Sequence, residues 1–564
     1  MAVTAPKDPE QQRAFFYIMR QKEIYLSQNS DGTGVQFLYQ SDGRLESSAK
    51  VVGGIEDEEI IDLLGSVNGF RKLIHSLGVS VELDNPEEEA TFIFQMYGKE
   101  DLYGGGTNLM ISSRGDGSES RIYLADIEWK DDDDIPGQIR IETNIPDKKG
   151  TLSVRFYLND GYTAPEQEED INVNTESEEY KSMICNSIVS VGNTKRLSDA
   201  IKRAQAGENV TLAYIGGSIT QGAGATPINT ECYAYKSYCA FSDMFGKNNN
   251  VKYVKAGVGG TPSELGMLRF DRDVLRDGTV IPDVVVVEFA VNDEGDETKG
   301  DCYESLVRKI LKLPNSPAVI LLFSVFADDY NLEDRLIPVG VRYDLPMVSV
   351  KRAVTPQFYN KEERVLTKNQ YFYDCYHPTN LGHTIMGDCI KYLFKIVFEN
   401  NSDIIYSPDF DLKPAIGASF DDVFLMDKKQ LLENVKIEEG GFIFTDNVLQ
   451  SVEMDMDLSL TPQFPYNWMY DGSKNKNNTF KMQIKCKRLV LIFKDSGEVD
   501  AAKADVYVDG KFVREADSYI NRWLHCNPII VIDENISTMH DVEIKVHEAD
   551  LDKKFTILGF GVVK

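Results

Sequence analysis

The stretch VTLAYIGGSITQGAGAT, from Val210 to Thr226, indicates how the middle of the chain folds. It opens with a near-continuous apolar run that turns, through two glycines, into a segment carrying a single serine, Ser218. Apolar runs without alternation are typical of strands that are covered on both faces of a parallel sheet. Ligands of such sheets bind at the carboxyl ends of the strands. Ser218 therefore stands where we expect chemistry.

Four later apolar runs repeat this pattern and are separated by longer polar and apolar stretches that are typical of helices. They are VKYVKAG at 251–257, DVVVVEFAV at 283–291, AVILLFSVF at 318–326 and PMVSV at 346–350. Strands that alternate with helices predict an α/β domain with three α/β/α layers, in which helices cover both faces of a parallel sheet. We place this domain at residues 180–400.

Two acidic, polar, proline-bearing stretches at residues 159–182 and 399–414 are typical of linkers. Before the first, helix-like segments extend to about residue 80 and short alternating runs follow them. This predicts a helical segment plus a β-sandwich domain over residues 1–165. After the second linker, further alternating runs predict another β-sandwich domain over residues 401–564.

The composition excludes several classes of partner. The chain of 564 residues has 90 acidic and 60 basic side chains, a formal net charge of -30, and no basic stripe with interleaved aromatics. We therefore expect neither nucleic acid nor membrane as a partner.

The first residues carry charges where a signal peptide needs an apolar core, so we expect a cytoplasmic protein. Eight scattered cysteines favour reduced thiols over disulfides or zinc.

Three interpretations compete for the glycine-rich loop around Ser218. A phosphate-binding loop needs a lysine after Gly222, where the chain has Ala223. A tight strand-to-helix turn with a capping serine needs no further residue. A nucleophilic serine needs a histidine base, an orienting carboxylate and donors for the oxyanion. The loop alone does not separate the last two.

The middle part contains two histidines, His377 and His383, which limits the choice of a base. His377 stands three residues after Asp374 in DCYHPTNLGH, beyond the last predicted strand. Taken alone, such a pair is typical of a solvated turn. A metal site built from Asp374, His377 and His383 lacks a further convincing ligand.

Two more motifs offer donors at strand ends. KAGVGGTP offers the backbone N–H of Gly260, and EFAVND offers the side-chain amide of Asn292. Each has a simpler explanation, since Gly260 fits a tight turn and Asn292 fits an ordinary strand end. All four features nevertheless fall in order at consecutive strand ends. Their coincidence favours a serine hydrolase site.

With these motifs the chain resembles the SGNH, or GDSL-like, hydrolases, a family of serine esterases and lipases with a flavodoxin-like α/β/α fold. The resemblance covers roughly residues 185–398 and rests on GGSIT, GVGGT, VND and DCYHP taken together. One departure is Gly217, where the GDS signature has aspartate. The wider stretches IGGSITQGAGA, VEFAVND and HPTNLGH look more like the carbohydrate-esterase branches that remove acetyl groups from plant polysaccharides.

The resemblance implies a role for each matching residue. Ser218 is the nucleophile, His377 the base and Asp374 the acid that orients it, while Ser218, Gly260 and Asn292 form the oxyanion hole. It implies no metal and no organic cofactor. The implied reaction is removal of O-acetyl groups from acetylated plant-type oligosaccharides, such as fragments of xylan, xyloglucan or mannan.

Two other functions stay open from the sequence. One is an esterase or lipase for simple short-chain esters, and the other is a carbohydrate-binding protein with an inactive hydrolase core. In the C-terminal region, Trp523 and His525 are possible substrate-binding residues, because a rigid aromatic ring suits the face of a sugar. Packing at the edge of a sandwich is the alternative.

Glu288 lies inside an apolar run, and we expect Arg269 to be its ion-pair partner.

Overall fold

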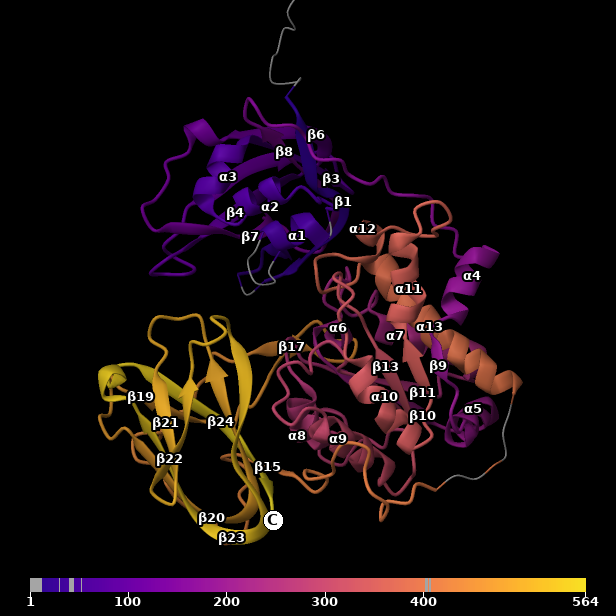
Figure 1. The fold of residues 1–564 in the computed structure, drawn as a ribbon, viewed down its shortest axis with the longest axis vertical. Helices are drawn as coiled ribbons and strands as arrows, with labels where there is room; N and C mark the ends of the chain where they lie inside the picture. The colour runs from indigo at the N-terminus through magenta and orange to yellow at the C-terminus, as the bar shows by residue number, and fades with distance from the viewer. Residues whose placement is uncertain (1–12, 30, 40–44, 52, 401–403, 405–406) are drawn as a thin grey trace, which may run out of the picture.

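The computed structural model describes residues 13–29, 31–39, 45–51, 53–400, 404 and 407–564. It has three parts, each built around a sheet of its own (Figure 1). In Figure 1 the N-terminal sheet lies at the top and the C-terminal sheet at the lower left, and the middle part lies beside both. No helix among the described residues is long and apolar enough to cross a membrane.

The middle part contains a six-stranded sheet in the order β11-β10-β12-β13-β14-β9. Every neighbouring pair is parallel except β14 and β9. The first parallel strand along the chain lies between the second and the third, which is the flavodoxin-like strand order. The strands are β9 (Ile188–Ser190), β10 (Val210–Gly216), β11 (Val251–Gly257), β12 (Val284–Glu288), β13 (Ala318–Phe323) and β14 (Met347–Ser349).

Helices cover both faces of this sheet, so the prediction of three α/β/α layers is confirmed. One face carries α4 (Glu178–Cys185), α5 (Lys195–Ala206), α7 (Tyr233–Phe245), α11 (Val350–Tyr359) and α13 (Asn380–Glu399). The other face carries α8 (Ser263–Asp273), α9 (Asp301–Leu311) and α10 (Glu333–Arg342). Two short helices, α6 (Ser218–Gln221) and α12 (Lys368–Tyr371), complete the middle part.

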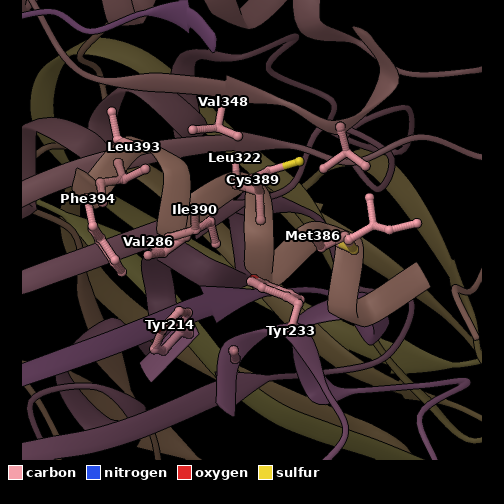
Figure 2. Packing of buried hydrophobic residues seen from close by; sticks show 14 of the residues in the cluster. Tyr214, Tyr233, Val286, Leu322, Val348, Met386, Cys389, Ile390, Leu393 and Phe394 are labelled. Carbon is pink, nitrogen blue, oxygen red and sulfur yellow. The ribbon is translucent and has the colours of Figure 1, made fainter. Parts of the chain in front are cut away.

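Figure 2 shows side chains from the first of the two cores between sheet and helices. Tyr214, Val286 and Leu322 come from three neighbouring strands and share this core with Ile390 and Phe394 of α13. All five side chains are fully buried. The alternate residues of the same strands, such as Ile215, are buried in the second core. This burial on both faces is the reason for the continuous apolar runs in the sequence.

The N-terminal part is an eight-stranded antiparallel sheet in the order β5-β4-β7-β2-β1-β8-β3-β6. Its strands are β1 (Phe15–Gln28), β2 (Gly34–Tyr39), β3 (Ile74–Leu83), β4 (Glu89–Gly98), β5 (Asn108–Arg114), β6 (Asp116–Tyr123), β7 (Asp133–Thr143) and β8 (Lys148–Leu158). Between β2 and β3 the chain forms α1 (Leu45–Val51), α2 (Glu58–Leu64) and α3 (Val67–Leu73), and a 3-10 turn, η2 (Leu124–Asp126), follows β6.

The sequence interpretation of the region before residue 80 as helical is only partly right. Two strands, β1 and β2, precede the helices, and the helix-like stretch changes into β3 at Ile74. Phe70, Leu73, Ile74 and Leu77 have helical spacing, which hides the point where the strand begins. In β1 a register shift near Gln21 breaks the period of two on which strand recognition depends.

The C-terminal part is a second sheet, in the order β15-β24-β20-β23-β21-β22, with β16 paired to β20 and β19 paired to β24. Its strands are β15 (Phe424–Met426), β16 (Lys436–Glu438), β19 (Trp468–Asp471), β20 (Thr479–Asp495), β21 (Lys503–Val508), β22 (Lys511–Asp517), β23 (His525–Val546) and β24 (Lys554–Val563). A separate hairpin of β17 (Ser451–Glu453) and β18 (Leu460–Pro462) precedes β19, and the 3-10 turn η3 (Glu548–Asp550) precedes β24. The chain is thus an α/β protein with sheet-rich regions at both ends.

Candidate active site

Ser218 begins the short helix α6, directly after β10 and the turn residue Gly217. It therefore stands at the carboxyl edge of the parallel sheet, where α/β proteins bind ligands. A Cβ atom on Gly217 would lie 2.0 Å from Oδ1 of Asn292. Any larger residue at 217 would meet this side chain. Glycine at 217 thus lets Asn292 approach the serine loop closely in this chain.

Ser218 and His377 lie 159 residues apart in sequence but are in hydrogen-bond contact. Nε2 of His377 lies 2.9 Å from Oγ of Ser218, and Nδ1 lies 2.8 Å from Oδ2 of Asp374. The other carboxylate oxygen of Asp374 accepts bonds from the N–H groups of Tyr376 and His377, each at 2.8 Å. The three predicted catalytic side chains form one continuous chain of hydrogen bonds.

Electrostatics fixes the proton positions in this chain. Burial would raise the pKa of Asp374, but His377 and the two backbone N–H groups outweigh burial and hold the pKa below its usual value. Ionised Asp374 only accepts hydrogen bonds, so Nδ1 of His377 carries the proton and donates to it. The lone pair of Nε2 then faces the Ser218 hydroxyl. This tautomer can take a proton from the serine.

The loop that carries Asp374 and His377, residues 372–378, is called the base loop below. Its ends are tied together, because the N–H of Tyr373 donates to the carbonyl of His377 at 2.7 Å and Phe372 forms an antiparallel bridge with Pro378. α12 ends where the base loop begins, and α13 starts shortly after it. The base loop is therefore a compact turn held between two helices.

The predicted oxyanion donors come from the ends of three neighbouring strands, β10, β11 and β12. The Gly259–Gly260 turn lies next to the serine, since a Cβ on Gly259 would be 3.9 Å from Cβ of Ser218. Gly260 has a φ of +68°, which is the left-handed region that favours glycine. Asn292 follows β12 and lies against Gly217, and its buried Oδ1 has no hydrogen-bond partner among the residues that the structure describes.

The expected ion pair between Arg269 and Glu288 is wrong. Arg269 pairs with Asp273 at 3.1 Å, and its other guanidinium donor binds the carbonyl of Gly216 at 2.8 Å. A further bond of 2.7 Å runs to the carbonyl of Ala256. Arg269 thus ties the ends of β10 and β11 together. Backbone carbonyls leave no trace in a sequence, which is why the pattern of side chains pointed to the wrong partner.

Glu288 is instead part of a polar group around Thr220 in the serine loop. It accepts a hydrogen bond from the hydroxyl of Thr220 at 3.1 Å, and that hydroxyl also bonds Tyr233 at 2.7 Å. Burial raises the pKa of Glu288 to about 7, although the hydrogen bond from Thr220 favours the ionised form. These contacts hold the first turn of the loop that begins at Ser218.

The second histidine of the middle part holds backbone. Nδ1 of His383 accepts from the N–H of Tyr233 at 3.2 Å, so Nε2 carries the proton and donates to the carbonyl of Ala223 at 3.0 Å. Burial lowers the pKa of His383 to about 3, so the ring is neutral. Both nitrogens are used in fixing the glycine-rich loop against α7. His377 is therefore the histidine that faces Ser218.

The C-terminal part reaches the site just before β23. A Cβ on Gly260 would lie 2.7 Å from the ring of Trp523 and 3.3 Å from the ring of His525. The two rings are 4.3 Å apart and tilted by 32°. Trp523 is 39% exposed, whereas His525 is buried at 6% and burial lowers its pKa to about 4. Trp523 therefore offers an exposed aromatic surface beside Gly260.

Three residues that support the site carry no motif and were missed by sequence reasoning. Gln450 donates to the carbonyl of Gly259 at 2.8 Å, Lys22 donates to the carbonyl of Phe372 at 2.9 Å, and Tyr103 donates to the carbonyl of Arg522 at 2.6 Å. Each comes from outside the middle part. Only the packing of the three parts brings them to the site loops.

A cavity of about 660 Å³ lies in the C-terminal part and contains none of the predicted site residues. Its three lysines pair with acidic lining groups, as Lys494 does with Asp446 at 2.8 Å and Lys554 with Asp500 at 2.7 Å. The hydrogen-bonded chain at Ser218 is the stronger candidate site.

Residues 214–385 match the model of the GDSL-like Lipase/Acylhydrolase family. The middle part is a GDSL-like hydrolase domain. All five predicted motif residues, from Ser218 to His377, lie inside the matched segment. The chain is therefore a carboxylic ester hydrolase.

Solved structures of other proteins extend this likeness. Two structures of a two-domain esterase active on acetylated mannans, one co-crystallised with mannopentaose, are 26% identical to the chain and cover 68% of it. The matches include 98% and 99% of those chains, with TM-scores of 0.56 and 0.57. A variant of an acetyl xylan esterase from Geobacillus stearothermophilus matches 36% of this chain and 99% of its own, at 18% identity and a TM-score of 0.27. A search of curated proteins found no match.

Proposed function

We propose that this GDSL-like hydrolase is a serine esterase that removes O-acetyl groups from acetylated plant-type oligosaccharides, namely fragments of mannan, xylan or xyloglucan. The observation that carries the proposal is the hydrogen-bonded chain from Ser218 through His377 to Asp374 at the carboxyl edge of the sheet. The likeness to a two-domain esterase active on acetylated mannans supports the class of substrate.

In the first half of the proposed reaction, Oγ of Ser218 attacks the carbonyl carbon of the acetyl ester while Nε2 of His377 takes the hydroxyl proton. The negative charge that develops on the carbonyl oxygen is met by the N–H groups of Ser218 and Gly260 and by the amide of Asn292. His377 then gives its proton to the sugar oxygen as the ester C–O bond breaks. The products are acetyl-Ser218 and a free sugar hydroxyl.

In the second half, water attacks the acetyl group while His377 takes a proton from it. The proton passes to Oγ of Ser218 as the acetate leaves, which restores the starting state. Asp374 holds the imidazole ring in place and stabilises the imidazolium in both halves. Since its pKa is held below the usual value, Asp374 stays ionised through the neutral range.

Trp523 supports a sugar as the leaving group. Its ring is partly exposed and lies against Gly260, so a sugar whose acetyl group is attacked by Ser218 has an aromatic surface within reach. We propose that His525, which is buried and stacks near Trp523, acts by holding that ring in place. Trp468 is 1% exposed and lies in the core of the C-terminal part, so it has a structural role.

The test is release of acetate from a panel of acetylated manno-, xylo- and xyloglucan oligosaccharides, with 4-nitrophenyl acetate as a small comparison ester. We expect the parent enzyme to deacetylate at least one glycan class and Ser218→Ala to fall to near background on every substrate. Ser242→Ala, in α7 of the same domain, is the matched control and should keep full activity.

Two results would overturn the proposal in different ways. Activity of Ser218→Ala within tenfold of the parent would remove the serine mechanism. Hydrolysis of the aryl ester without acetate release from any glycan would leave an esterase for simple short-chain esters in its place.

A further inference from the structure

Strand β1 of the N-terminal sheet carries a bulge where it approaches the hydrolase domain. Two of its residues, Arg20 and Gln21, stand opposite a single residue of β8, Ser153. Gln21 has a φ of +46°, and its N–H donates to the hydroxyl of Ser153 at 2.9 Å. A bulge of this kind changes the direction of the side chains that follow it. The next residue along β1 is Lys22.

Lys22 binds the backbone just ahead of the catalytic acid and base. Its ammonium donates to the carbonyl of Phe372 at 2.9 Å and to that of Asn369 at 3.3 Å. The side chain belongs to the N-terminal sheet, yet it is buried against the hydrolase domain and only 7% exposed. Figure 1 shows α12 beside β1. Phe372 is the first residue of the base loop, two positions before Asp374. The lysine therefore holds the point from which the base loop departs.

Further residues of β1 and β2 bind the base loop and the start of α13. Gln36 of β2 donates to the hydroxyl of Tyr373 at 3.2 Å, and Glu23 accepts a hydrogen bond from Asn380 at the start of α13. Tyr373 is also packed against the hydrophobic core of the N-terminal sheet. The N-terminal sheet thus meets the base loop at its beginning, along its length and just beyond its end.

We propose that Lys22 is a positioning residue of the hydrolase, and that the N-terminal sheet belongs to the catalytic apparatus because it holds the base loop. The inference rests on the proposed function, since it requires Ser218 and His377 to be the reacting pair. Lys22 touches neither of them and acts through the backbone of the base loop. A displacement of about 1 Å in a catalytic group can cost on the order of 10²-fold in rate.

The charge of Lys22 gives this role a dependence on pH. Burial lowers the pKa of Lys22 to about 8, against the pull of Asp170 on the linker and Asp374 on the base loop. Asp170 also accepts bonds from Thr367 and Asn369, beside α12, and Glu23 is bound to Asn380. Lys22 therefore carries its charge at pH 7 and loses it as the pH rises through about 8. An ammonium binds carbonyl groups more strongly than a neutral amine does.

The experiment measures kcat and KM of the full-length enzyme on 4-nitrophenyl acetate from pH 6 to 10. We expect Lys22→Met to lower kcat about tenfold or more at pH 7 while KM stays within twofold, because Lys22 does not contact the substrate. Lys22→Arg keeps a charge and donors and should recover kcat to within about threefold. Lys148→Met, which removes a lysine paired with Glu88 elsewhere in the same sheet, is the matched control and should leave kcat unchanged.

The pH profile separates positioning from general stability. In the parent, kcat should fall on the alkaline side near pH 8, and in Lys22→Arg this fall should disappear, since arginine stays charged. A kcat of folded Lys22→Met within twofold of the parent would overturn the inference. If that variant does not fold, a parent kcat that stays level to pH 9.5 would overturn it instead. If Ser218→Ala is inactive while Lys22→Met has normal kinetics, only this inference is refuted. If Ser218→Ala is active, the proposed function is refuted.

Discussion

The two flanking sheets meet the hydrolase domain in different ways. The C-terminal sheet shares a hydrophobic core with it, in which Val490, Ile492 and Leu558 pack together with Leu265 and Leu268 of α8. The N-terminal sheet has a core of its own, against which Tyr373 of the base loop packs, and it holds the base loop through hydrogen bonds from Lys22 and Gln36. The oxyanion side of the site is therefore backed by shared apolar packing, and the base side by directed hydrogen bonds.

The two kinds of contact have different effects: apolar packing stabilises the fold, whereas hydrogen bonds fix the positions of particular atoms. Burial of apolar surface contributes about 25 cal/mol per Å² and has no preferred direction, so it joins two bodies firmly without fixing any one atom. A hydrogen bond contributes about 0.5–1.5 kcal/mol but fixes both its partners in distance and angle. We infer that the C-terminal sheet and the hydrolase unfold as one body, while the N-terminal sheet mainly orients a loop. A direct bond from Tyr103 to Arg522 joins the two sheets beside Trp523.

The largest effect expected in this comparison of the two flanking sheets concerns the oxyanion hole, and it gives a reference for the effects of the sheet contacts. Asn292→Ala removes the proposed oxyanion donor, which neither flanking sheet supplies, so kcat should fall by roughly 10²–10³ with little change in KM. The measurement is steady-state kinetics on 4-nitrophenyl acetate. Asn315→Ala, which loses a bond to the carbonyl of Pro282 in the same domain, is the control and should keep kcat. A loss below tenfold would show that Asn292 is not such a donor.

The shared core is tested by Leu268→Ala. Leu268 is 2% exposed and in contact with the C-terminal sheet, since a Cβ on Gly561 would lie 2.3 Å from its side chain. The cavity should cost about 2–4 kcal/mol, and amide hydrogen exchange should rise in α8 and in β20 together. Leu152→Ala, in the N-terminal core, should raise exchange in the N-terminal strands alone. Faster exchange in α8 without a change in β20 would contradict a single unfolding body.

The smallest expected effect concerns substrate choice. Trp523→Ala should lower kcat/KM about tenfold for an acetylated oligosaccharide and less than twofold for 4-nitrophenyl acetate, because only the larger substrate extends beyond the acetyl group. Phe512→Ala removes an aromatic side chain that is 58% exposed in β22 and should change neither value. Equal losses on both substrates would show that Trp523 supports the Gly260 turn and does not bind sugar.

Much of the site could be predicted because its residues stand in short motifs. Ser218, Gly260 and Asn292 follow apolar runs, and a parallel sheet brings the carboxyl ends of its strands to one edge. Asp374 and His377 lie instead between α12 and α13, away from any strand end, and were found through their motif alone. The partner of Glu288 could not be predicted in the same way. A buried carboxylate binds a donor that the fold brings close to it, and no sequence pattern links Thr220 with Glu288, which lies 68 residues away.

By itself, the sequence determined the layered α/β domain and the residues that we propose as reactive, because burial on both faces and glycine turns impose local patterns that survive in the order of residues. Only the tertiary structure decided what surrounds those residues. Lys22, Gln450 and Trp523 lie far from the motifs along the chain, and their contacts with the base loop and the Gly259–Gly260 turn depend on how three separate sheets pack. Such contacts are made largely with backbone atoms, which every residue has, so no choice of side chain in the motifs records them.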